Sequence, residues 1–352
     1  MKAVLVLEDG TYYQGTAFGK KGTAHGEVVF NTCMTGYQEV LTDPSYRGQM
    51  VVMTYPLIGN YGFNTEDSES GTPHVRAFIV RELCDYPSNW RSSVTAGTFF
   101  DDVMVLSDID TRHLTRHIRE QGSMYAVLST ESDDIEALAQ KARELSGEPK
   151  ELVAEVTRKK PRHIEGKGPH VAVLDFGVKE NILRSLQGLG AAVTVLPADT
   201  TAEAVKALSP DGILLSNGPG DPRDIPRAIE TIKGLIGYKP TLGICLGHQL
   251  LGLALGGTIY KLKFGHHGGN HPVKDLTTGR VYITSQNHNY ALGEDFSPDI
   301  TVTHMNLNDN TLEGFVHNKL PLLSVQYHPE AAPGPLDSDY IFHQFYELIK
   351  AS

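Results

Sequence analysis

The sequence predicts an α/β protein with two domains: an N-terminal, mixed, strand-rich α/β domain, followed by an open, mostly parallel sheet with helices on both faces. Its 352 residues are enough for two cores of ordinary size. Short β-type runs between Gly, Asp and Pro turns fill the first part. From His170 onward, uninterrupted apolar strands alternate with amphipathic helical segments. This alternation is typical of a parallel sheet that is covered on both sides.

The first domain is predicted to span residues 1–147. Its strand-like segments are 2–8, 27–32, 49–56 and 75–83. Two helical segments, 107–122 and 132–147, begin with Ser and Asp caps and end at Gly122 and Gly147. Residues 148–169 lose the apolar periodicity and gain Lys, Pro and Gly, so we expect a linker there.

The second domain is predicted to span residues 170–352. Four strand-then-helix pairs open it, and the last pair joins the strand 241–245 to the helix 248–257. Further strand-like runs and a closing helix over 340–350 complete it. Active sites of such sheets lie at the carboxyl ends of the strands, so those ends are where we look for functional side chains.

The charge of the chain limits its partners. With 42 acidic against 31 basic residues, the formal net charge is -11, which disfavours a broad electrostatic hold on nucleic acid or on an anionic membrane. No apolar run is long enough to cross a bilayer. The three cysteines are far apart and show no CxxC spacing, which suits a reducing, cytoplasmic location better than a disulfide framework.

Cys245 is the candidate nucleophile. It stands in Gly-Ile-Cys-Leu-Gly, between a strand and a helix, where the flanking glycines permit a sharp turn that projects the thiol above the sheet. The amino end of the following helix favours the thiolate. A cysteine taken alone is more often a small buried hydrophobe, and that is our interpretation of Cys33 and Cys84, which have no such surroundings.

A thiol nucleophile needs a base, and His328 qualifies by its position after the apolar strand 322–325. Glu330, two residues later, can orient the imidazole and stabilise its charged form. A histidine at a strand end is usually a structural hydrogen-bonding group. The pairing with the cysteine turn is what makes His328 a catalytic candidate.

Acyl transfer also requires donors for the developing oxyanion. The backbone N–H of Leu246, one residue past the nucleophile, is the expected first donor. The loop 216–222, Ser-Asn-Gly-Pro-Gly-Asp-Pro, leaves the same end of the sheet and is a candidate for the second. The alternative is that this loop is a simple turn, which is the usual role of such dipeptides.

The sequence indicates no metal site and no phosphate-binding loop. His266, His267 and His271 lie close together, but they lack cysteine partners and the usual helical spacing of zinc ligands, so we interpret them as part of a structural loop. No GxxxxGK[ST] motif occurs. If ATP drives the chemistry, another chain should supply its main site.

These motifs, NGPGDP, GICLGHQ and the His-Pro-Glu of QYHPEA, resemble those of class I, triad-type glutamine amidotransferases. The resemblance implies that Cys245 attacks the side-chain amide of glutamine, that His328 is the acid and base, and that Glu330 orients it. Amidotransferase domains of GMP synthetase, CTP synthase and anthranilate synthase share these motifs, so they define the half-reaction and not the final product.

The rest of the chain resembles the small-subunit family of carbamoyl phosphate synthetases, through LEDGTYYQG, the segment 26–62, and the helix IDTRHLTRHIREQG. KFGHHGGNHPV and ITSQNHNYA are similar as well. By position, the resemblance implies a glutamine site that includes the residues Ser45, Gly218, Gly220, Leu246, Gln249, Asn287, Asn289 and Tyr290. Gly220 and Leu246 would be the oxyanion donors. At Asn289 and Tyr290 relatives often carry Gly and Phe. Lys179 resembles a position near the site, although we favour a solvated lysine in a first helical turn.

This resemblance further implies a carbon–nitrogen ligase complex that serves pyrimidine or arginine biosynthesis. This chain would bind no cofactor itself, and a large synthetase subunit would bind ATP and Mg. That partner would receive ammonia through a closed passage and make carbamoyl phosphate from bicarbonate and two ATP. The helix with Arg112, Arg116 and Arg119 could contact the partner, although a solvated helix face is the simpler interpretation.

Two rival functions remain open from the sequence. One is a cysteine hydrolase or peptidase that uses the same turn without any synthetase. The other is a non-catalytic regulatory or scaffold subunit, which would keep its function after Cys245→Ser.

Overall fold

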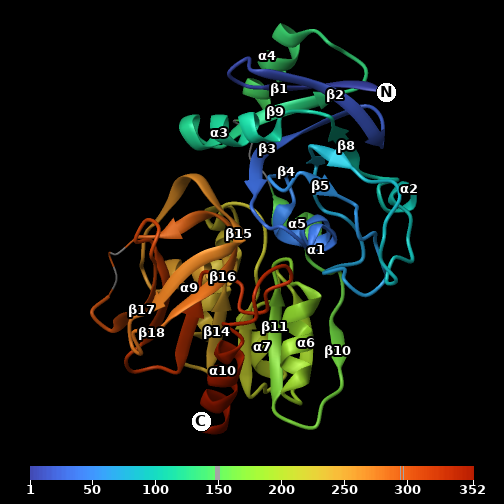
Figure 1. Cartoon of the computed structure of the whole chain (residues 1–352). Helices are drawn as coiled ribbons and strands as arrows, with labels where there is room; N and C mark the ends of the chain where they lie inside the picture. Colours follow the sequence, from blue (N-terminus) through green and yellow to red (C-terminus); the bar gives the residue numbers. More distant parts are fainter. Residues whose placement is uncertain (147–150, 294, 296) are drawn as a thin grey trace. The chain divides into compact units, whose positions relative to one another are not determined.

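The computed structural model describes residues 1–146, 151–293, 295 and 297–352, and the chain divides into two compact units (Figure 1). The first unit comprises Met1–Lys150 and Lys263–His267, and the second comprises Glu151–Leu262 and Gly268–Ser352. Gly147, the predicted end of a helix, and residues 148–150 of the predicted linker lie outside the described residues. The segment 263–267 belongs to the first unit, although its position in the sequence predicts the second domain.

The first unit is built on a closed β-barrel with the strand order β1-β2-β8-β6-β4-β3-β9. Its strands are β1 (Lys2–Leu7), β2 (Tyr12–Gly19), β3 (Thr23–Asn31), β4 (Gln49–Met53), β6 (Ala77–Ile79), β8 (Met104–Ser107) and β9 (Met124–Ser129). β1 pairs antiparallel with both β2 and β9, which closes the barrel. Side chains alternate along β1, so that Leu5 and Leu7 join one buried cluster while Val4 and Val6 join another. The predicted strand-rich character is confirmed, as is the hairpin that the first residues of the chain predict, whereas β8 and β9 were not predicted.

Short helices and a two-stranded sheet complete the first unit. They are α1 (Tyr37–Thr42), η1 (Pro44–Tyr46), β5 (Leu57–Ile58), β7 (Glu82–Leu83), α2 (Ala96–Phe99), α3 (Thr111–Gln121) and α4 (Ile135–Ser146). α3 begins where the Asp110 carboxylate accepts a hydrogen bond from the His113 N–H at 2.9 Å, and it ends at Gly122 with a φ of 107°. Its three arginines are exposed, so they do not stabilise the core of this unit.

The second unit contains a ten-stranded sheet with the order β10-β12-β11-β13-β14-β19-β18-β17-β15-β16. The central strands β12 (Ala192–Pro197), β11 (His170–Asp175), β13 (Gly212–Leu215), β14 (Thr241–Ile244) and β19 (Leu322–Val325) are mutually parallel. β18 (Leu312–His317), β17 (Ile300–Asn306) and β15 (Ile259–Asp275) continue the sheet in antiparallel register, and β16 (Val281–Leu292) forms its edge. The parallel centre therefore continues into an antiparallel part.

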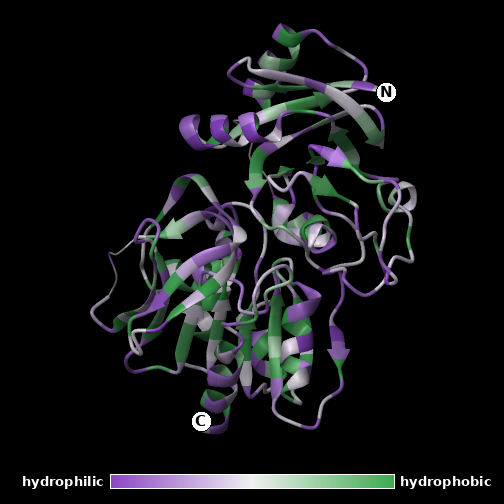
Figure 2. Ribbon diagram, in the orientation of Figure 1, coloured by the Kyte–Doolittle hydropathy of each residue, from purple (hydrophilic) through white to green (hydrophobic). Residues whose placement is uncertain are grey.

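Helices bury both faces of this sheet. They are α6 (Glu180–Gly188), α7 (Ala202–Ala207), α8 (Pro226–Leu235), α9 (Leu246–Ala254) and α10 (Tyr340–Lys350), with the short η2 (Pro222–Asp224) before α8. One buried cluster joins the sheet to α6 and α10, and a second joins it to α7, α8 and α9. Figure 2 shows the central strands as largely hydrophobic. The predicted parallel sheet with helices on both faces is confirmed.

The predicted linker differs from the structure over all of its described residues, 151–169. Residues 151–169 belong to the second unit and contain α5 (Leu152–Val156) and β10 (Arg162–Ile164). β10 forms the edge of the sheet, where it pairs antiparallel with β12, and Val153 lies in a buried core cluster. The high Lys, Pro and Gly content reflects an exposed edge strand, because edge strands are often rich in charged residues and proline.

Among the described residues, no helix combines the length and the apolar character that crossing a membrane requires.

Candidate active site

Cys245 occupies the sharp turn that the glycine pattern predicts. It follows β14 directly and is the N-cap of α9, with φ 53° and ψ -106°, a conformation that non-glycine residues rarely adopt. Its N–H donates to the Val325 carbonyl at 2.9 Å, and its carbonyl accepts from the Gln249 N–H at 3.1 Å. The strained backbone is thus held from both sides, and Cys245 is buried, with 2% of the residue exposed.

The flanking glycines are required by close backbone approach. A Cβ at Gly247 would collide with the backbone carbonyl of Leu215, and one at Gly243 would lie 2.8 Å from the Gly247 oxygen. Neither collision could be relieved by rotating a side chain. The Gly247 N–H also donates to the Ser216 carbonyl at 2.9 Å, which fixes the turn against the neighbouring strand end.

His328 lies at the adjacent strand end. β14 and β19 pair in parallel, with Ile244 opposite Val325, so Cys245 and His328 both follow the carboxyl ends of neighbouring strands. The His328 N–H donates to the Ser285 carbonyl of β16 at 2.9 Å. The Cys245 thiol lies 3.5 Å from the Asn287 carbonyl on the same strand. The structure therefore brings together the two groups that the sequence analysis paired.

Glu330 orients the imidazole. Its Oε1 lies 2.6 Å from His328 Nδ1, and both side chains are almost completely buried. Because this carboxylate accepts at Nδ1, that nitrogen carries the proton, and Nε2 is the atom left for proton exchange. Besides the contact with Glu330, His328 has a side-chain hydrogen bond with Cys245.

The charges of this array shift its pKa values in opposite directions. Burial alone would lower the pKa of His328, but the negative charges of Glu330 and then of Cys245 outweigh it, and the pKa lies well above 6.5. Burial would likewise raise the pKa of Glu330, yet the positive charges of Lys179 and His328 lower it. The arrangement therefore favours an ionised carboxylate beside a protonated imidazole.

Lys179 is not the solvated lysine that we favoured from the sequence. It is only 2% exposed, and its Nζ lies 3.0 Å from Glu330 Oε1. The same ammonium donates to the Ala331 carbonyl at 2.5 Å. The prediction was wrong because the side chain of Lys179, the N-cap of α6, contacts Glu330 and Ala331 instead of solvent. A buried ammonium needs a charged partner, and Glu330 supplies it.

The candidate oxyanion donors lie next to the turn. Leu246 is the first residue of α9, so its N–H precedes the first intrahelical hydrogen bond and remains available to donate. A Cβ at Gly218 would lie 2.7 Å from Leu246 Cδ2, so the 216–222 loop approaches Leu246 closely. Gly220 has a φ of 89°, which favours glycine. The close approach to Leu246 favours a functional loop at 216–222 over the simple turn that was the alternative.

The remaining predicted glutamine-site residues of the second unit lie at the end of β16 and on α9. Asn287, Asn289 and Gln249 are buried, and Tyr290 is half-buried. The Gln249 amide donates to the Tyr290 carbonyl at 2.8 Å and to Gln326 Oε1 at 3.0 Å. Gln249 therefore braces this strand end, and its contact with glutamine stays a prediction.

Sequence reasoning missed a polar cluster that joins Tyr290 to the glycine loop. The Arg223 guanidinium donates to both carboxylate oxygens of Asp221, with an Nε–Oδ1 distance of 2.9 Å. The Tyr290 hydroxyl also donates to Asp221, and the Arg223 guanidinium carbon lies 5.8 Å from the centre of the Tyr290 ring. The sequence offered one signal for this cluster, because Asp221 directly follows Gly220, a predicted site residue.

A second missed feature is a buried hydrogen-bond network around Glu313. Gln286 Nε2 donates to Glu313 Oε2 at 2.9 Å, and Asn306 Nδ2 donates to Oε1 at 3.0 Å. His288 has one ring nitrogen 2.9 Å from Gln286 Oε1 and the other 2.8 Å from the Tyr290 carbonyl. The network fixes the strand that carries Asn287 and Asn289, because each carbonyl and amide in it has a defined partner.

Three further residues from the sequence analysis lie in the first unit. Ser45 is buried in η1, where its N–H donates to Asp43 Oδ1 at 2.9 Å, and its contact with glutamine stays a prediction. Cys33 is buried, as predicted. Cys84 is only partly buried, contrary to the prediction, because it lies just past β7 with its thiol 3.4 Å from the Tyr86 carbonyl.

The predicted histidine loop is a strand. His266, His267 and His271 all lie on β15, which runs without a break from Ile259 to Asp275. The His267 carbonyl accepts from the Thr32 N–H at 3.2 Å, and the His271 carbonyl accepts from Thr284 Oγ1 at 3.0 Å. The glycines between these histidines suggested a loop, but β-ladder pairing outweighed that local preference.

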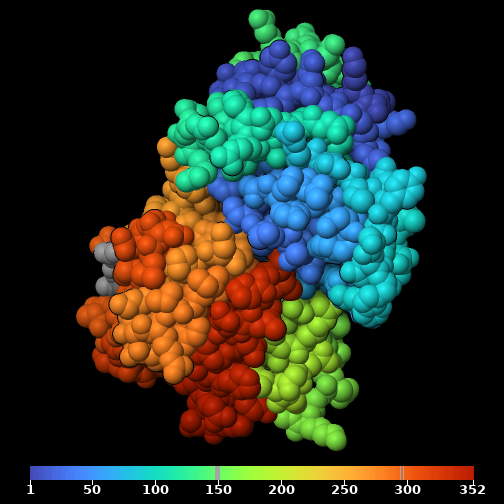
Figure 3. All heavy atoms as spheres, in the orientation of Figure 1, coloured from blue at the N-terminus to red at the C-terminus, as the bar shows by residue number. Residues whose placement is uncertain are grey.

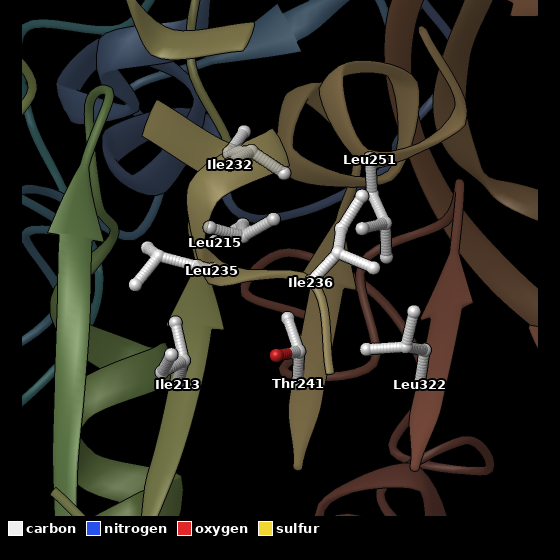
Figure 4. Close-up of a pocket in the computed structure, with 8 residues that line it drawn as sticks. All are labelled: Ile213, Leu215, Ile232, Leu235, Ile236, Thr241, Leu251 and Leu322. Atoms are coloured by element: carbon white, nitrogen blue, oxygen red, sulfur yellow. The ribbon is translucent and has the colours of Figure 1, made fainter. Parts of the chain in front are cut away.

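Figure 4 shows an apolar space between the sheet and the helices α8 and α9. Its volume is about 10 Å³, and its lining residues are Ile213, Leu215, Ile232, Leu235, Ile236, Thr241, Leu251 and Leu322. It is barely large enough for one water molecule and offers that molecule few polar partners. We therefore assign it to core packing and not to substrate binding.

Two family models match the chain in separate segments. Residues 172–348 match the family described as glutamine amidotransferase class-I. Residues 5–128 match the family described as carbamoyl-phosphate synthase small chain, CPSase domain.

Curated relatives match over nearly the whole length. The carbamoyl phosphate synthase small chain of Syntrophotalea carbinolica is 53% identical, covering 99% of this chain and 98% of its own. The carbamoyl phosphate synthase pyrimidine-specific small chain of Bacillus subtilis is 50% identical, covering 100% of this chain and 97% of its own. The carbamoyl phosphate synthase small chain of Clostridium perfringens is 52% identical, covering 98% of this chain and 99% of its own.

Proposed function

Because this chain belongs to the carbamoyl phosphate synthase small chain family, we propose that it is the glutamine-hydrolysing subunit of a carbamoyl phosphate synthase. The observation that carries this proposal is the buried array of Cys245, His328 and Glu330 at adjacent strand ends. Arrays in which a nucleophile contacts a histidine and a third group orients that histidine support acyl transfer in unrelated folds.

The array supports a thioester route. His328 Nε2 holds the proton that the Cys245 thiol gives up, and the sulfur attacks the side-chain carbonyl carbon of glutamine. The N–H groups of Leu246 and Gly220 stabilise the negative oxygen of the tetrahedral intermediate. His328 then returns the proton to the nitrogen, which leaves as ammonia. Water, deprotonated by His328, attacks the thioester and releases glutamate and the thiol.

Glu330 and Lys179 position the base in this route. The carboxylate holds the proton on His328 Nδ1 and stabilises the imidazolium that forms during each half of the reaction. Lys179 compensates the buried charge of Glu330, so that the carboxylate stays ionised when His328 is neutral.

The proposal includes a larger partner chain. Free ammonia is mostly protonated near neutral pH and would then be a poor nucleophile, so a closed passage to a second active site is needed. We assign ATP and Mg to that large chain, which would make carbamoyl phosphate from ammonia and bicarbonate. A cytoplasmic location is supported by the absence of any disulfide bond among Cys33, Cys84 and Cys245. The name of the Bacillus subtilis relative supports pyrimidine biosynthesis as the pathway.

The test is ammonia release from glutamine by the purified chain, with and without its large chain. Cys245→Ser and His328→Asn should each lower hydrolysis by about a thousandfold or more, because each removes a member of the array. Cys84→Ser, which alters a partly buried thiol in the other unit, is the matched control for the isolated chain and should retain its parent rate. Synthesis from added ammonia should persist in every complex.

A parent rate of hydrolysis in Cys245→Ser would overturn the assignment of the nucleophile. Hydrolysis of peptides without hydrolysis of glutamine would favour a cysteine peptidase instead.

A further inference from the structure

The largest exposed aromatic side chains of the first unit lie on one segment, residues 84–92, which we call the aromatic loop. Tyr86 and Trp90 are each 91% exposed, and Trp90 is the single tryptophan of the chain. In Figure 3 the chain around this loop, coloured cyan, lies at the surface. Large aromatic rings are costly to leave in water, so their exposure points to a binding partner.

The aromatic loop has a defined backbone conformation. The Cys84 N–H donates to the Ile58 carbonyl at 2.7 Å, and the Ser88 N–H donates to the Asn60 carbonyl at 2.9 Å. At its other end, the Ser93 N–H donates to the Phe63 carbonyl at 2.9 Å. Both ends of the loop are thus fixed to the segment 58–63, and the two rings are presented on an ordered scaffold.

An ion pair further fixes the loop beside Trp90. Arg91 donates to Asp67 at 2.6 Å and to Glu66 at 3.2 Å, and the Asn89 side chain accepts from the Arg91 N–H at 2.8 Å. Ordered aromatic side chains lose little conformational entropy on binding, which is why Trp and Tyr dominate the energetics of protein interfaces.

The charges around the loop argue for a protein partner. Single-stranded nucleic acid stacks on aromatic side chains that lie in positively charged grooves. Here the neighbouring cation, Arg91, is already paired with Asp67 and Glu66, and Asp85 adds another acidic group within the loop. Leu57, which is 39% exposed on the strand that pairs with β7, adds apolar surface near the start of the loop.

We propose that the aromatic loop, through Tyr86 and Trp90, is a docking surface for the large synthase chain. The loop lies within residues 5–128, which match the domain found in carbamoyl phosphate synthase small chains, and outside residues 172–348, which match amidotransferases in general. A surface that serves the synthase complex belongs in the former segment. This inference rests on the proposed function, because that function supplies the partner.

Truncation of the rings should weaken the complex and leave the fold intact. Trp90→Ala and Tyr86→Ala should each raise the dissociation constant for the large chain by about tenfold or more, as central interface aromatics do. Tyr12→Ala, on β2 of the same unit and 53% exposed, is the matched control and should change it less than about twofold. Sedimentation or surface plasmon resonance with the purified large chain gives these constants. Equal effects of all three variants would contradict the inference.

A direct test uses the single tryptophan as a label. Because Trp90 is unique, 5-fluorotryptophan gives one ¹⁹F resonance in the full chain. Adding unlabelled large chain should shift that resonance and reduce its sensitivity to a soluble paramagnetic quencher. An unchanged, quencher-sensitive resonance in a sample where sedimentation shows the complex would overturn the docking inference and leave the proposed function standing.

Two other outcomes would overturn the inference in distinct ways. A concentration-dependent shift without the large chain would identify a second copy of this chain as the occupant. Absence of any complex with the large chain, for the unaltered protein, would overturn the proposed function and the docking inference together.

Discussion

At the scale of single residues, the candidate site is an arrangement of buried charges. The Glu330 carboxylate contacts Lys179 on one side and His328 on the other, and all three side chains are almost completely buried. Buried ions are stable only when they are paired, so the stability of the folded protein depends strongly on the protonation of these three groups. This dependence can be measured as stability against pH.

The Glu330 carboxylate should make the protein less stable in acid. Its pKa in the folded protein, about 2, lies below its ordinary value of 4.5, so its contribution is present above pH 4.5 and is lost as the pH falls towards 2. We expect the parent to lose on the order of 2 kcal/mol of unfolding free energy more than Glu330→Gln over this range. Urea unfolding at a series of pH values measures it.

An exposed carboxylate provides the control for that experiment. Glu347→Gln, on α10, should follow the parent curve, because its side chain is 70% exposed and paired with Lys350 at the surface. Parallel curves for the parent and Glu330→Gln would show that Glu330 is not held as an ion.

The Tyr290 hydroxyl should support catalysis from a distance. Tyr290→Phe removes its hydrogen bond to Asp221 and keeps the ring beside Arg223, so the loop that carries Gly220 loses one support. We expect kcat/KM for glutamine hydrolysis to fall about fivefold, equivalent to about 1 kcal/mol. Tyr238→Phe loses a comparable hydroxyl bond, to the Lys206 carbonyl, and should leave kcat/KM unchanged. Equal kinetics for the two variants would be evidence against this role.

At the scale of elements, the passage from β14 to α9 decides whether the thiol is presented at all. The helix can begin at Leu246 only because Gly247 lets it approach the end of β13. The element boundary and the site are therefore one feature, and a substitution that moves the helix should impair both stability and catalysis.

Gly247→Ala and Gly188→Ala test this with the same chemical change in two helices. A Cβ at Gly247 meets the Leu215 backbone, whereas a Cβ at Gly188 meets no atom within 4 Å. We expect Gly247→Ala to cost about 1–3 kcal/mol and most of the hydrolysis rate. Gly188→Ala should be neutral or stabilising by up to about 1 kcal/mol. Urea unfolding and ammonia release measure both, and similar results for the two variants would contradict the steric explanation.

At the scale of the whole molecule, the two units are not two consecutive pieces of chain. The segment Lys263–His267 returns from the second half of the sequence to the first unit. There the Phe264 ring lies 5.8 Å from the Phe30 ring, and the Lys263 carbonyl accepts from the Ser123 N–H at 2.8 Å. The barrel core of the first unit therefore depends on residues encoded much later.

Phe264→Ala should destabilise the first unit by about 1–3 kcal/mol, because truncating a half-buried ring costs less than truncating a fully buried one. Hydrogen exchange should accelerate in β3, which carries Phe30. Val281→Ala, an exposed position on β16, is the control and should leave β3 unchanged. Exchange that accelerates only in the second unit would show that Phe264 does not support the barrel.

The sequence by itself determined the local features of this protein. Glycines on both sides of Cys245 predict a turn that only glycines permit, and the alternation of apolar strands with helices predicts a parallel sheet whose strand ends bear the site. Cys245 could be identified because it directly follows the strand β14, and His328 and Glu330 because they follow the end of β19 within five residues, where a short-range pattern decides the position.

Only the tertiary structure decided which distant groups meet. Four features depend on contacts between residues far apart in the chain. They are the burial of Lys179, the pairing that makes a strand of the histidine-rich segment, the contacts of Tyr290 with Asp221 and Arg223, and the return of Phe264 to the barrel. Such contacts leave no periodic signal, because packing and charge pairing act through space and override the preference of any single segment.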